Sequence, residues 1–414
     1  MKRDSNYEIV IIDGTARVPG EDMGHMIGME TAAYCADQRH STLLVVGSFS
    51  HILKQQRSAQ SGVVKTEDGY DILFIPTNSY SSHLGFKRLL WFLTFAFGVF
   101  NKLRIISGAK VISLSTPMPF LDVLVPLLKL ATKAKVVVLI RDLWPEHFQS
   151  VEGAGRRLIF CLATGPIRWM RAVMLRYADA TASVSSLGVG LATAANPGAP
   201  HLLLPNVTVS CSDFRPDELL DRSYFCGPEQ LLLNYSGTMG DGYDVELLIR
   251  AVAQINQETN GRIKLVISGA GPQFHSLQSR IKSIGNNHIQ MVGLIPWREY
   301  RSLVFNSDLS VLPYKLGSSV DFPAKFYDYL VAGTPVLHSL PGELKSFTDQ
   351  HRCGFYYQAS NFDSILEALR VVISNLPELN GARENASRLG PRFEKEIQLK
   401  EFLKLYTGGF FNEK

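Results

Sequence analysis

The sequence is poor in cysteine, and its cysteines are not arranged for cross-linking or for metal binding. No two form a Cys-x-x-Cys pair or show a Cys/His spacing typical of zinc, and they are scattered along 414 residues: Cys35, Cys161, Cys211, Cys226 and Cys353. An odd and dispersed set excludes a disulfide framework and indicates a reducing cytosol. The polar stretch from Met1 to Asn6 leads directly into a strand-like run, so no signal peptide is expected.

The sequence has no hydrophobic run long enough to cross a bilayer as a helix, which needs about 20 residues. The longest run, Leu89 to Phe100, has 12 residues. We therefore expect no integral span. Two interpretations remain open: a helix buried against a sheet, or a surface helix in the lipid interface with basic neighbours at headgroup level. Those neighbours are Lys87, Arg88, Lys102 and Arg104.

A second segment favours the interfacial interpretation. Arg157, Arg168 and Arg171 fall on one face of a helix, near Trp169. The Gly165-Pro166 pair weakens the argument, because it is expected to divide this segment into two helices. The sequence thus predicts a cytoplasmic protein with peripheral contact to the anionic inner face of the cytoplasmic membrane.

Charge is unevenly distributed along the chain. Met1 to Val207 carry 21 Lys and Arg against 15 Asp and Glu, a net of +6, and the remainder carries 21 against 23, a net of −2. A basic first half attracts anions such as acidic lipid or a phosphorylated substrate. The sequence has no basic-aromatic recognition motif, so nucleic acid is not an expected partner.

Short apolar runs alternate with helical patterns along nearly the whole chain. This alternation is typical of parallel sheets that are covered by helices on both faces. The first series of expected strands is 8–13, 41–47, 71–76, 110–115, 135–141 and 180–184; the second begins at 231 and continues with 263–268, 289–292, 309–313, 335–338 and 354–357. The predicted fold class is α/β, with two doubly wound Rossmann-like domains.

The two series set the expected domain boundaries. We expect a first domain over 1–207, a linker over 208–230, a second domain over 231–392, and a C-terminal helix within 393–414. Ligands of such sheets bind at the carboxyl ends of the strands. The functional residues are therefore expected on the loops that follow the strands, facing a cleft between the domains.

Two glycine-containing turns follow expected strands of the second domain. The turn from Tyr235 to Gly242 (YSGTMGDG) joins a strand to a helix, a geometry in which backbone N–H groups can hold a phosphate. It is neither a P-loop nor a dinucleotide fingerprint. The turn from Ser268 to Pro272 (SGAGP) allows a base or phosphate to approach the backbone, or is simply a tight turn.

A third motif is a short helix that begins after Pro323 and ends before Gly333. Lys325 and Asp328 lie three residues apart on it and share one face. A lysine suits a phosphate, and a carboxylate can accept two hydrogen bonds from a ribose diol. The alternative is an ordinary surface ion pair.

A fourth motif follows a strand of the first domain. Arg141 and Asp142 come directly after a continuous apolar run and are followed by Trp144. Charges at such a place are costly to hold unless they act on a ligand or on each other. A structural Arg–Asp pair is the alternative to a functional one.

Together these motifs resemble those of family 4 glycosyltransferases with the GT-B fold, and the resemblance spans nearly the whole chain. It is greatest to the bacterial O-antigen, capsule and exopolysaccharide transferases of the N-acetyl-L-fucosamine transferase type. The motifs that carry it are GSFSH at Gly47, RDLWPE at Arg141, LPN at Leu204, YSGTMG at Tyr235, SGAGP at Ser268, Val292-Gly293 with Pro296, PAKFYDYLVAGTPV at Pro323, and Pro341-Gly342-Glu343.

The resemblance implies roles for individual residues. Lys325 would contact the donor diphosphate and Asp328 the ribose hydroxyls, and Asp142, Arg141 and Lys325 would form the catalytic set. Other implied donor contacts are Gly237, Thr238, Gly269, Gly271, Pro272 and Asp321, and the implied acceptor-side loop residues are Gly24, His51 and Glu146. The resemblance further implies that the C-terminal helix crosses back to the first domain, and that neither a catalytic metal nor another cofactor is needed.

Two departures from the family pattern concern the donor site. Where many relatives carry an Arg and a Lys that grip the diphosphate, this sequence has Thr238 and Tyr243. Where many carry two glutamates eight apart, it has Asp328 and, eight residues earlier, Val320, with Asp321 adjacent. Two missing cations remove charge-assisted hydrogen bonds of about 1.5–3 kcal/mol each unless other groups replace them.

The sequence thus predicts a retaining hexosyltransferase. It would move a sugar from a nucleotide diphosphate, with UDP the expected carrier, to a lipid-linked saccharide in bacterial surface polysaccharide biosynthesis. Two alternatives remain open: a catalytically impaired protein of the same fold that scaffolds or activates another transferase, and a nucleotide-sugar epimerase of similar build. The sugar, the acceptor, the linkage and the oligomeric state are not defined by the sequence.

Overall fold

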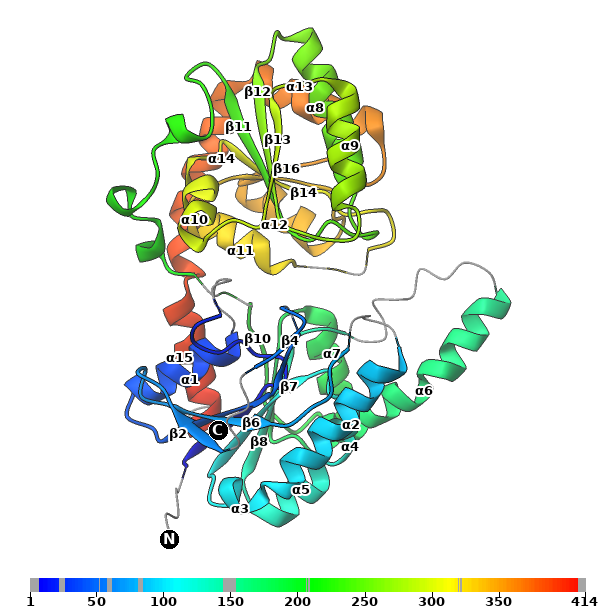
Figure 1. Cartoon of the computed structure of the whole chain (residues 1–414), viewed down its shortest axis with the longest axis vertical. Helices are drawn as coiled ribbons and strands as arrows, with labels where there is room; N and C mark the ends of the chain where they lie inside the picture. The colour runs from blue at the N-terminus through cyan, green and yellow to red at the C-terminus, as the bar shows by residue number, and fades with distance from the viewer. Residues whose placement is uncertain are drawn as a thin grey trace. The chain divides into compact units, whose positions relative to one another are not determined.

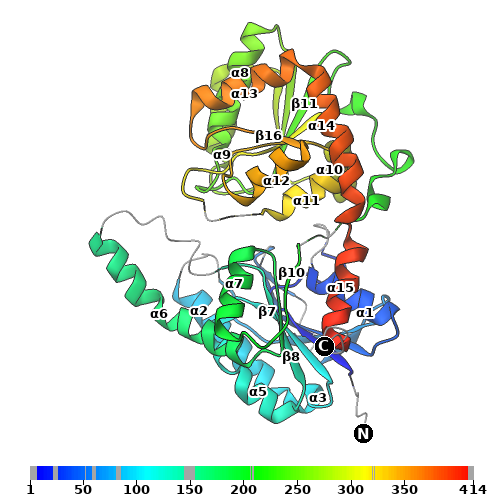
Figure 2. The ribbon, with the colours of Figure 1, turned by 180° about the vertical axis from the view of Figure 1, so that it is seen from behind.

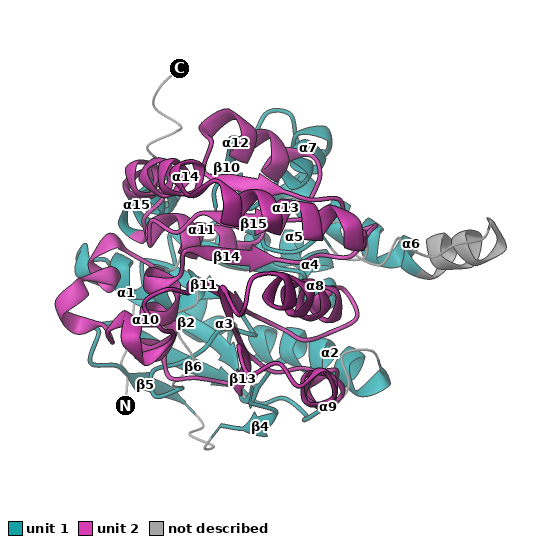
Figure 3. Cartoon of the chain, turned by 90° about the horizontal axis from the view of Figure 1, so that it is seen from above, with its two compact units in different colours: residues 1–208, 396–414 teal, residues 209–395 magenta. Residues whose placement is uncertain are grey.

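The protein folds into two compact units (Figure 3). The computed structural model describes residues 7–21, 27–51, 53–57, 62–80, 85–143, 154–205, 207, 209–318, 320 and 322–408, with the backbone alone for 154–163. The first unit consists of residues 1–208 and 396–414, and the second of residues 209–395. The C-terminal segment therefore belongs to the first unit, although it follows the second in the sequence.

The first unit is built on one long sheet. Within the described residues its strand order is β10-β9-β8-β7-β1-β2-β6-β5, and all neighbours are parallel except β5 and β6. The strands are β1 (Ile9–Ile12), β2 (Thr42–Gly47), β5 (Val63–Lys65), β6 (Asp71–Ile75), β7 (Val111–Thr116), β8 (Lys135–Ile140), β9 (Ala180–Ser183) and β10 (His201–Leu203); β3 (Phe49–Ser50) and β4 (Gln55–Gln56) form a separate small hairpin. The strands of the first predicted series are confirmed.

Helices cover both faces of this sheet because its central strands are apolar on both. On β1, Val10 and Ile12 face one hydrophobic cluster, and Ile9 and Ile11 face the other. One face is covered by α1 (Ile27–Asp37) and α15 (Lys395–Thr407) (Figures 1 and 2). The other is covered by α2 (Phe86–Asn101), α3 (Leu103–Ile106), α4 (Pro119–Val123), α5 (Val125–Thr132), α6 (Ala154–Tyr177) and α7 (Ser186–Ala195).

The C-terminal helix α15 is an integral part of the first unit. Its Leu399, Phe402 and Leu405 are buried in the same cluster as Ile27 of α1. The hydroxyl of Tyr406 also donates a hydrogen bond to Ser113 Oγ on β7 over 2.8 Å. The first unit therefore depends on residues from both ends of the chain.

Helix α6 corrects two sequence-based expectations. It runs through Gly165 and Pro166 without division, because a proline removes a single N–H donor, and the turns after it pack their apolar face on the unit. Arg171 is buried, and its charge acts on the buried Asp122, so it is not a headgroup contact. Trp169, in contrast, is 61% exposed. None of the described helices is both long and apolar enough to cross a membrane.

The second unit is a smaller doubly wound domain. Its sheet has the strand order β13-β12-β11-β14-β15-β16, all parallel. The strands are β11 (Leu231–Ser236), β12 (Ile263–Ser268), β13 (Ile289–Gly293), β14 (Leu309–Leu312), β15 (Val336–His338) and β16 (Gly354–Tyr356). The helices are α8 (Val245–Glu258), α9 (Phe274–Ile284), α10 (Trp297–Asn306), α11 (Ala324–Val331), α12 (Glu343–His351), α13 (Phe362–Ser374) and α14 (Leu376–Leu389). The predicted class, two Rossmann-like α/β domains, is confirmed.

The polar stretch between the two series forms three short 3-10 helices: η2 (Cys211–Phe214), η3 (Pro216–Glu218) and η4 (Arg222–Tyr224). They pack within the second unit. Arg222 pairs with Asp308 at 2.5 Å, and the Leu220 amide donates to Ser302 Oγ of α10 at 2.9 Å. This stretch is therefore an ordered edge of the second unit.

Candidate functional site

A polar cluster in the second unit lies where α10 and α11 begin, after the carboxyl ends of β13 and β14. Helix α11 starts after Pro323 and stops at Gly333, whose φ of 73° favours glycine. A Cβ at Gly333 would also lie 2.4 Å from Ser387 Oγ. Pro323 and Gly333 thus fix the two ends of the helix, and thereby place Lys325 and Asp328 on its first turns.

Lys325 and Asp328 do share one helix face, and a tyrosine from α10 joins them. The hydroxyl of Tyr300 donates to Asp328 Oδ2 over 2.8 Å. Lys325 Nζ lies 3.4 Å from the same oxygen and 3.9 Å from the centre of the Tyr300 ring. Trp297 stacks on Tyr300 with ring centres 5.3 Å apart. The result is a compact Lys–Tyr–Asp cluster, which differs from an exposed surface ion pair.

Asp328 and Tyr300 of this cluster are buried, and one oxygen of the Asp328 carboxylate has no donor among the described residues. Asp328 is 7% exposed and Tyr300 is 6% exposed. Burial, and then the negative charge of Asp328, raise the pKa of Tyr300 well above its ordinary value, so the phenol stays a donor. Among the described residues, none donates to Asp328 Oδ1. One carboxylate oxygen is thus held in place and the other can accept bonds from a diol.

The two glycine-containing turns pack directly on each other. A Cβ at Gly269 would lie 1.9 Å from Gly237 O, and one at Gly271 would lie 2.3 Å from Met239 O. The Gly237 amide donates to Ser268 O and the Met239 amide to Ala270 O, both over 3.0 Å. These glycines are therefore needed for loop packing. Within the described part of the chain, the amides of Thr238, Ala270 and Gly271 have no acceptor.

Thr238 and Tyr243, which stand where many relatives carry cations, occupy different environments. Thr238 is exposed on the turn. Tyr243 packs against Tyr314, with ring centres 4.9 Å apart, and against Tyr235, at 6.3 Å. An aromatic cluster thus takes the place of the missing lysine. Pro272 follows Gly271 in the adjacent turn, immediately before α9.

In the first unit, Arg141 pairs with an aspartate that the sequence motif did not include. Its Nη1 lies 2.7 Å from Oδ2 of Asp13, which is completely buried at the end of β1. Thr15 donates to the other oxygen through its amide and its hydroxyl, at 3.2 and 3.1 Å. Asp142, the next residue along, is exposed. Arg141 is therefore balanced by Asp13, and Asp142 is left available to a substrate.

His51 belongs to a second cluster at the same edge of the first sheet. Its Nδ1 forms a hydrogen bond with the hydroxyl of Tyr80. The ring of Tyr80 packs on Phe49, with ring centres 5.0 Å apart, and is approached by Lys54 Nζ at 4.7 Å from its centre. Three of the predicted site residues, Gly24, Glu146 and Asp321, lie outside the described residues.

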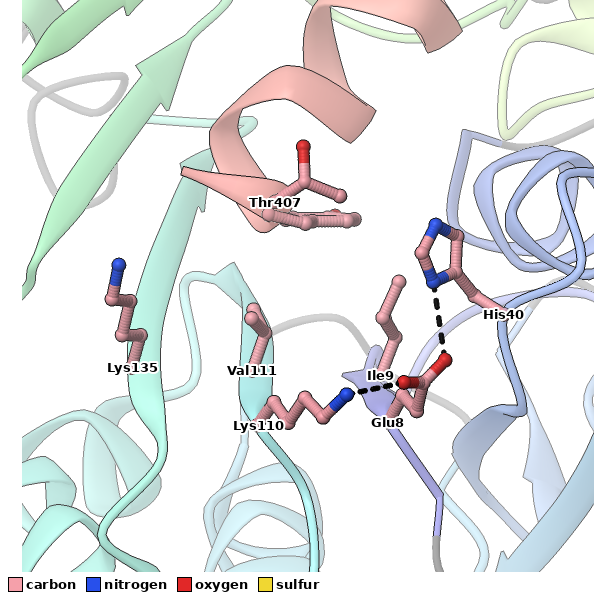
Figure 4. Close-up of a pocket in the computed structure, with 8 residues that line it drawn as sticks. Glu8, Ile9, His40, Lys110, Val111, Lys135 and Thr407 are labelled. Carbon is pink, nitrogen blue, oxygen red and sulfur yellow. Dashed lines mark hydrogen bonds and ion pairs between the residues drawn. The ribbon is translucent and has the colours of Figure 1, made fainter. Parts of the chain in front are cut away.

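The first unit also has a pocket of 360 Å³ at the opposite edge of its sheet (Figure 4). Glu8, which precedes β1, contacts Lys110 Nζ at 2.5 Å and His40 Nδ1 at 3.2 Å, and both contacts lower the pKa of Glu8. The pocket lies at the amino ends of the strands, whereas parallel sheets bind ligands at the carboxyl ends. We do not assign it to the functional site. No group of three His, Cys, Asp or Glu side chains in the described residues could hold a metal ion.

Sequence reasoning missed Tyr300 and Asp13. Both contacts are long-range: Tyr300 is 28 residues from Asp328, and Asp13 is 128 residues from Arg141. A signal for Asp13 was present, since it ends a continuous apolar strand just as Arg141 does. A signal for Tyr300 was weaker: it lies one turn into a helix that starts beside the Val292-Gly293 and Pro296 motif.

Comparisons with known proteins bear on the family and the fold of the chain. Residues 220–389 match the family of glycosyl transferases group 1. No curated protein sequence matches the chain. Sucrose-phosphate synthase from Thermosynechococcus elongatus is similar in structure, with a TM-score of 0.73, 15% identity, and coverage of 97% of this chain and 98% of the synthase.

Two further structures are similar over the whole chain. One is Anabaena Alr3699/HepE in complex with UDP-glucose, with a TM-score of 0.68, 13% identity and coverage of 97% and 100%. The other is WaaG, described as a glycosyltransferase involved in lipopolysaccharide biosynthesis, with a TM-score of 0.69, 14% identity and coverage of 97% and 100%. The chain has the GT-B fold, and the family match in its second unit supports a glycosyltransferase.

Proposed function

We propose that this chain is a retaining glycosyltransferase of the GT-B fold that takes its sugar from a UDP-linked donor. The second unit would bind the donor, since it contains the region matched by the group 1 family. The choice of UDP is supported by the similar structure of Alr3699/HepE, which is described in complex with UDP-glucose.

The Lys–Tyr–Asp cluster carries this proposal. Tyr300 holds Oδ2 of Asp328 at 2.8 Å, so Oδ1 can accept hydrogen bonds from the two ribose hydroxyls. Lys325 keeps 40% of its side chain exposed, so its ammonium group can turn from Asp328 to the diphosphate. The unpaired amides of Thr238, Ala270 and Gly271 would add neutral donors for the phosphates or the base.

The same groups would serve the reaction. As the bond between the sugar and the diphosphate breaks, negative charge develops on the leaving phosphate, and Lys325 and the loop amides would stabilise it. A leaving phosphate on the face attacked by the acceptor hydroxyl could take the proton of that hydroxyl, which retains the anomeric configuration. Asp142 would face the donor sugar, with Arg141 fixed by Asp13 beside it. No metal or cofactor enters this scheme.

We propose that the acceptor is a lipid-linked saccharide of surface polysaccharide biosynthesis, held by the basic first unit at the inner face of the cytoplasmic membrane. Its net charge of +6 over residues 1–207 suits a phosphorylated acceptor. The similar structure of WaaG, involved in lipopolysaccharide biosynthesis, supports the same process.

A specific observation also favours a second candidate, an impaired transferase that scaffolds a partner. Thr238 and Tyr243 supply no positive charge, and two amides of the glycine turns are already used in loop packing. Donor affinity therefore depends heavily on Lys325. If this cation is not sufficient, the chain binds no donor and acts only through its surface.

Transfer of labelled sugar from UDP-sugars into the lipid-soluble fraction of a bacterial membrane extract would separate the two candidates. We expect transfer by the wild type with retained configuration, and a loss of roughly ten- to hundredfold in Lys325→Ala, because one charge-assisted bond contributes about 1.5–3 kcal/mol. Lys345 offers a matched control, since it also has 40% of its side chain exposed, pairs with Asp349 at 2.5 Å and lies over a tyrosine ring. Equal transfer by Lys325→Ala and Lys345→Ala would exclude the proposed site.

A further inference from the structure

The pocket at the amino edge of the first sheet has the size of a small-molecule site. Its volume is 360 Å³, and such sites usually occupy about 300–1,000 Å³. All of the residues that line it belong to the first unit. The proposed sugar transfer uses the carboxyl edges of the sheets, so it gives this pocket no role.

Three neighbouring strands begin at this pocket with charged residues. Glu8 precedes β1, Lys110 precedes β7, and Lys135 is the first residue of β8. The Lys110 amide donates to Glu8 O and the Lys135 amide donates to Lys110 O, both over 2.9 Å. Adjacent strands lie about 4.8 Å apart, so the three side chains start from one short row along the edge of the sheet (Figure 4).

The walls of the pocket include buried apolar residues. Ile9 and Val111 are paired in register on β1 and β7, and they are 3% and 5% exposed. Tyr406 of α15 belongs to the same hydrophobic cluster, and its hydroxyl donates to Ser113 Oγ over 2.8 Å. A ligand with an apolar body would therefore remove apolar surface from water in this pocket.

Glu8 acts as an internal counter-ion and leaves no oxygen for a cationic ligand. Its Oε1 contacts Lys110 Nζ at 2.5 Å, and its Oε2 contacts His40 Nδ1 at 3.2 Å. The hydrogen bond with Lys110, and then that with His40, lower the pKa of Glu8, so the carboxylate stays ionised. Both oxygens are in use, and they hold Lys110 and His40 at the rim of the pocket.

The charge that remains in the pocket is positive. Among the described lining residues, Glu8 is the only acid, and Lys110 and Lys135 are both cations. With histidine counted as neutral, two positive charges and one negative charge give a net of +1. A monoanion would balance this charge, whereas a phosphate dianion would leave one negative charge without a counter-ion.

We infer that this pocket binds a small organic monoanion with an apolar body, of the class of aromatic carboxylates. The carboxylate would lie between Lys110 and Lys135, and the body would lie against Ile9 and Val111. Because Tyr406 belongs to α15, which follows the second unit in the chain, the ligand would contact segments from both ends of the sequence. Its binding would stabilise the packing of α15 on the sheet.

Calorimetric titration of the full chain with 2-naphthoate tests this inference without any nucleotide. We expect one site per chain, and at least tenfold weaker binding of 2-naphthamide, which has the same body but forms no charge-assisted bond with a lysine. Lys135→Met should weaken the binding of 2-naphthoate about tenfold, because the exposed Lys135 supplies one such bond. Lys65→Met, which replaces an exposed lysine on β5, should leave it unchanged.

A blocking variant tests the place of the apolar body. Thr407 lines the pocket and is exposed at the end of α15, so Thr407→Trp should fill the pocket and abolish binding while the melting temperature does not fall. Thr407→Ser is the matched control and should bind like the wild type.

The inference is overturned if the wild type does not bind 2-naphthoate, or binds 2-naphthamide equally well. Equal affinities in Lys135→Met and Lys65→Met, or in Thr407→Trp and Thr407→Ser, would also contradict it, since the probe would then bind elsewhere. Tighter binding of 2-naphthyl phosphate than of 2-naphthoate would show that the pocket does not select a monoanion.

Discussion

The hydroxyl of Tyr300 donates its hydrogen to Oδ2 of Asp328 over 2.8 Å, across two helices whose residues are far apart in the sequence. This bond fixes the carboxylate before any ligand arrives. It also brings the Tyr300 ring under Lys325 Nζ, at 3.9 Å from the ring centre. A single tyrosine thus positions both charged groups of the proposed donor site.

Tyr300→Phe should therefore weaken UDP binding about tenfold. It removes a hydrogen bond to a charged group, which contributes about 1.5–3 kcal/mol, but it keeps the ring under Lys325. Calorimetric titration with UDP measures the change. Trp297→Phe, which keeps an aromatic ring at the same stack, serves as the control. Unchanged affinity in Tyr300→Phe would show that Asp328 does not need Tyr300 for its role.

Gly269→Ala should destabilise the second unit and abolish donor binding. The added methyl would lie 1.9 Å from Gly237 O, and the φ of 127° at this position is strained for any residue with a side chain. We expect a loss of about 1–3 kcal/mol in the free energy of unfolding. Gly242→Ala is the matched control, because a Cβ there meets no atom within 4 Å. Equal stability of both variants would contradict the packing of the two turns.

Asp13→Asn should lower the free energy of unfolding of the first unit by about 3–5 kcal/mol, because it leaves Arg141 without its buried counter-ion. Arg141→Met should lower the free energy of unfolding by a similar amount, because it leaves the buried carboxylate of Asp13 without its counter-ion. The double variant should recover part of the loss, and the coupling is obtained from a double-mutant cycle in urea. Additive effects of the two substitutions would show that the pair is not a unit.

The buried carboxyl group of Asp122 should make the free energy of unfolding change with pH in the opposite direction to most carboxylates. Burial raises its pKa to about 6, against hydrogen bonds from Met118 and Thr116 and the charge of Arg171, which lower it. The folded state therefore holds this proton more tightly than the unfolded state does, and the carboxylate's contribution to stability falls as pH rises from about 4 to about 6. Asp122→Asn should gain up to about 3 kcal/mol at pH 7 relative to wild type, and almost nothing at pH 4.

Urea unfolding of both proteins at the two pH values measures this difference. Asparagine keeps an oxygen acceptor for the hydroxyl of Thr116 and the amide of Met118, which lie 3.1 and 3.2 Å from Asp122 Oδ2. A gain that does not change with pH would mean that the carboxylate is not the titrating group.

Much of the fold could be predicted because its strands are continuous apolar runs. β8 has five apolar residues after Lys135, and such a run has few alternatives to a central parallel strand. β10 was missed, since only three partly exposed residues pair with β9. The break expected at Pro166 was wrong because the packing of the turns after it outweighs one lost hydrogen bond.

The site was predictable only where it is local. Spacing alone places Lys325 and Asp328 on one face of α11, and the structure brings them within 3.4 Å. The residues that position them, or that neutralise Arg141, come from distant strands and helices, and no periodicity in the sequence pairs Asp13 with Arg141. The run from Leu89 to Phe100 had two interpretations for a similar reason: a run that is apolar on all sides does not show which face is covered.

Thermal unfolding of the purified chain with UDP, GDP, ADP, CMP and dTDP shows whether the second unit binds a UDP-linked donor through Lys325 and Asp328. A ligand at 100 times its dissociation constant adds about 2.7 kcal/mol to the free energy of unfolding. We expect stabilisation by UDP that persists in Lys345→Ala and is lost in Lys325→Ala and Asp328→Ala. Absence of stabilisation by any nucleotide, or stabilisation that survives in both site variants, would contradict it.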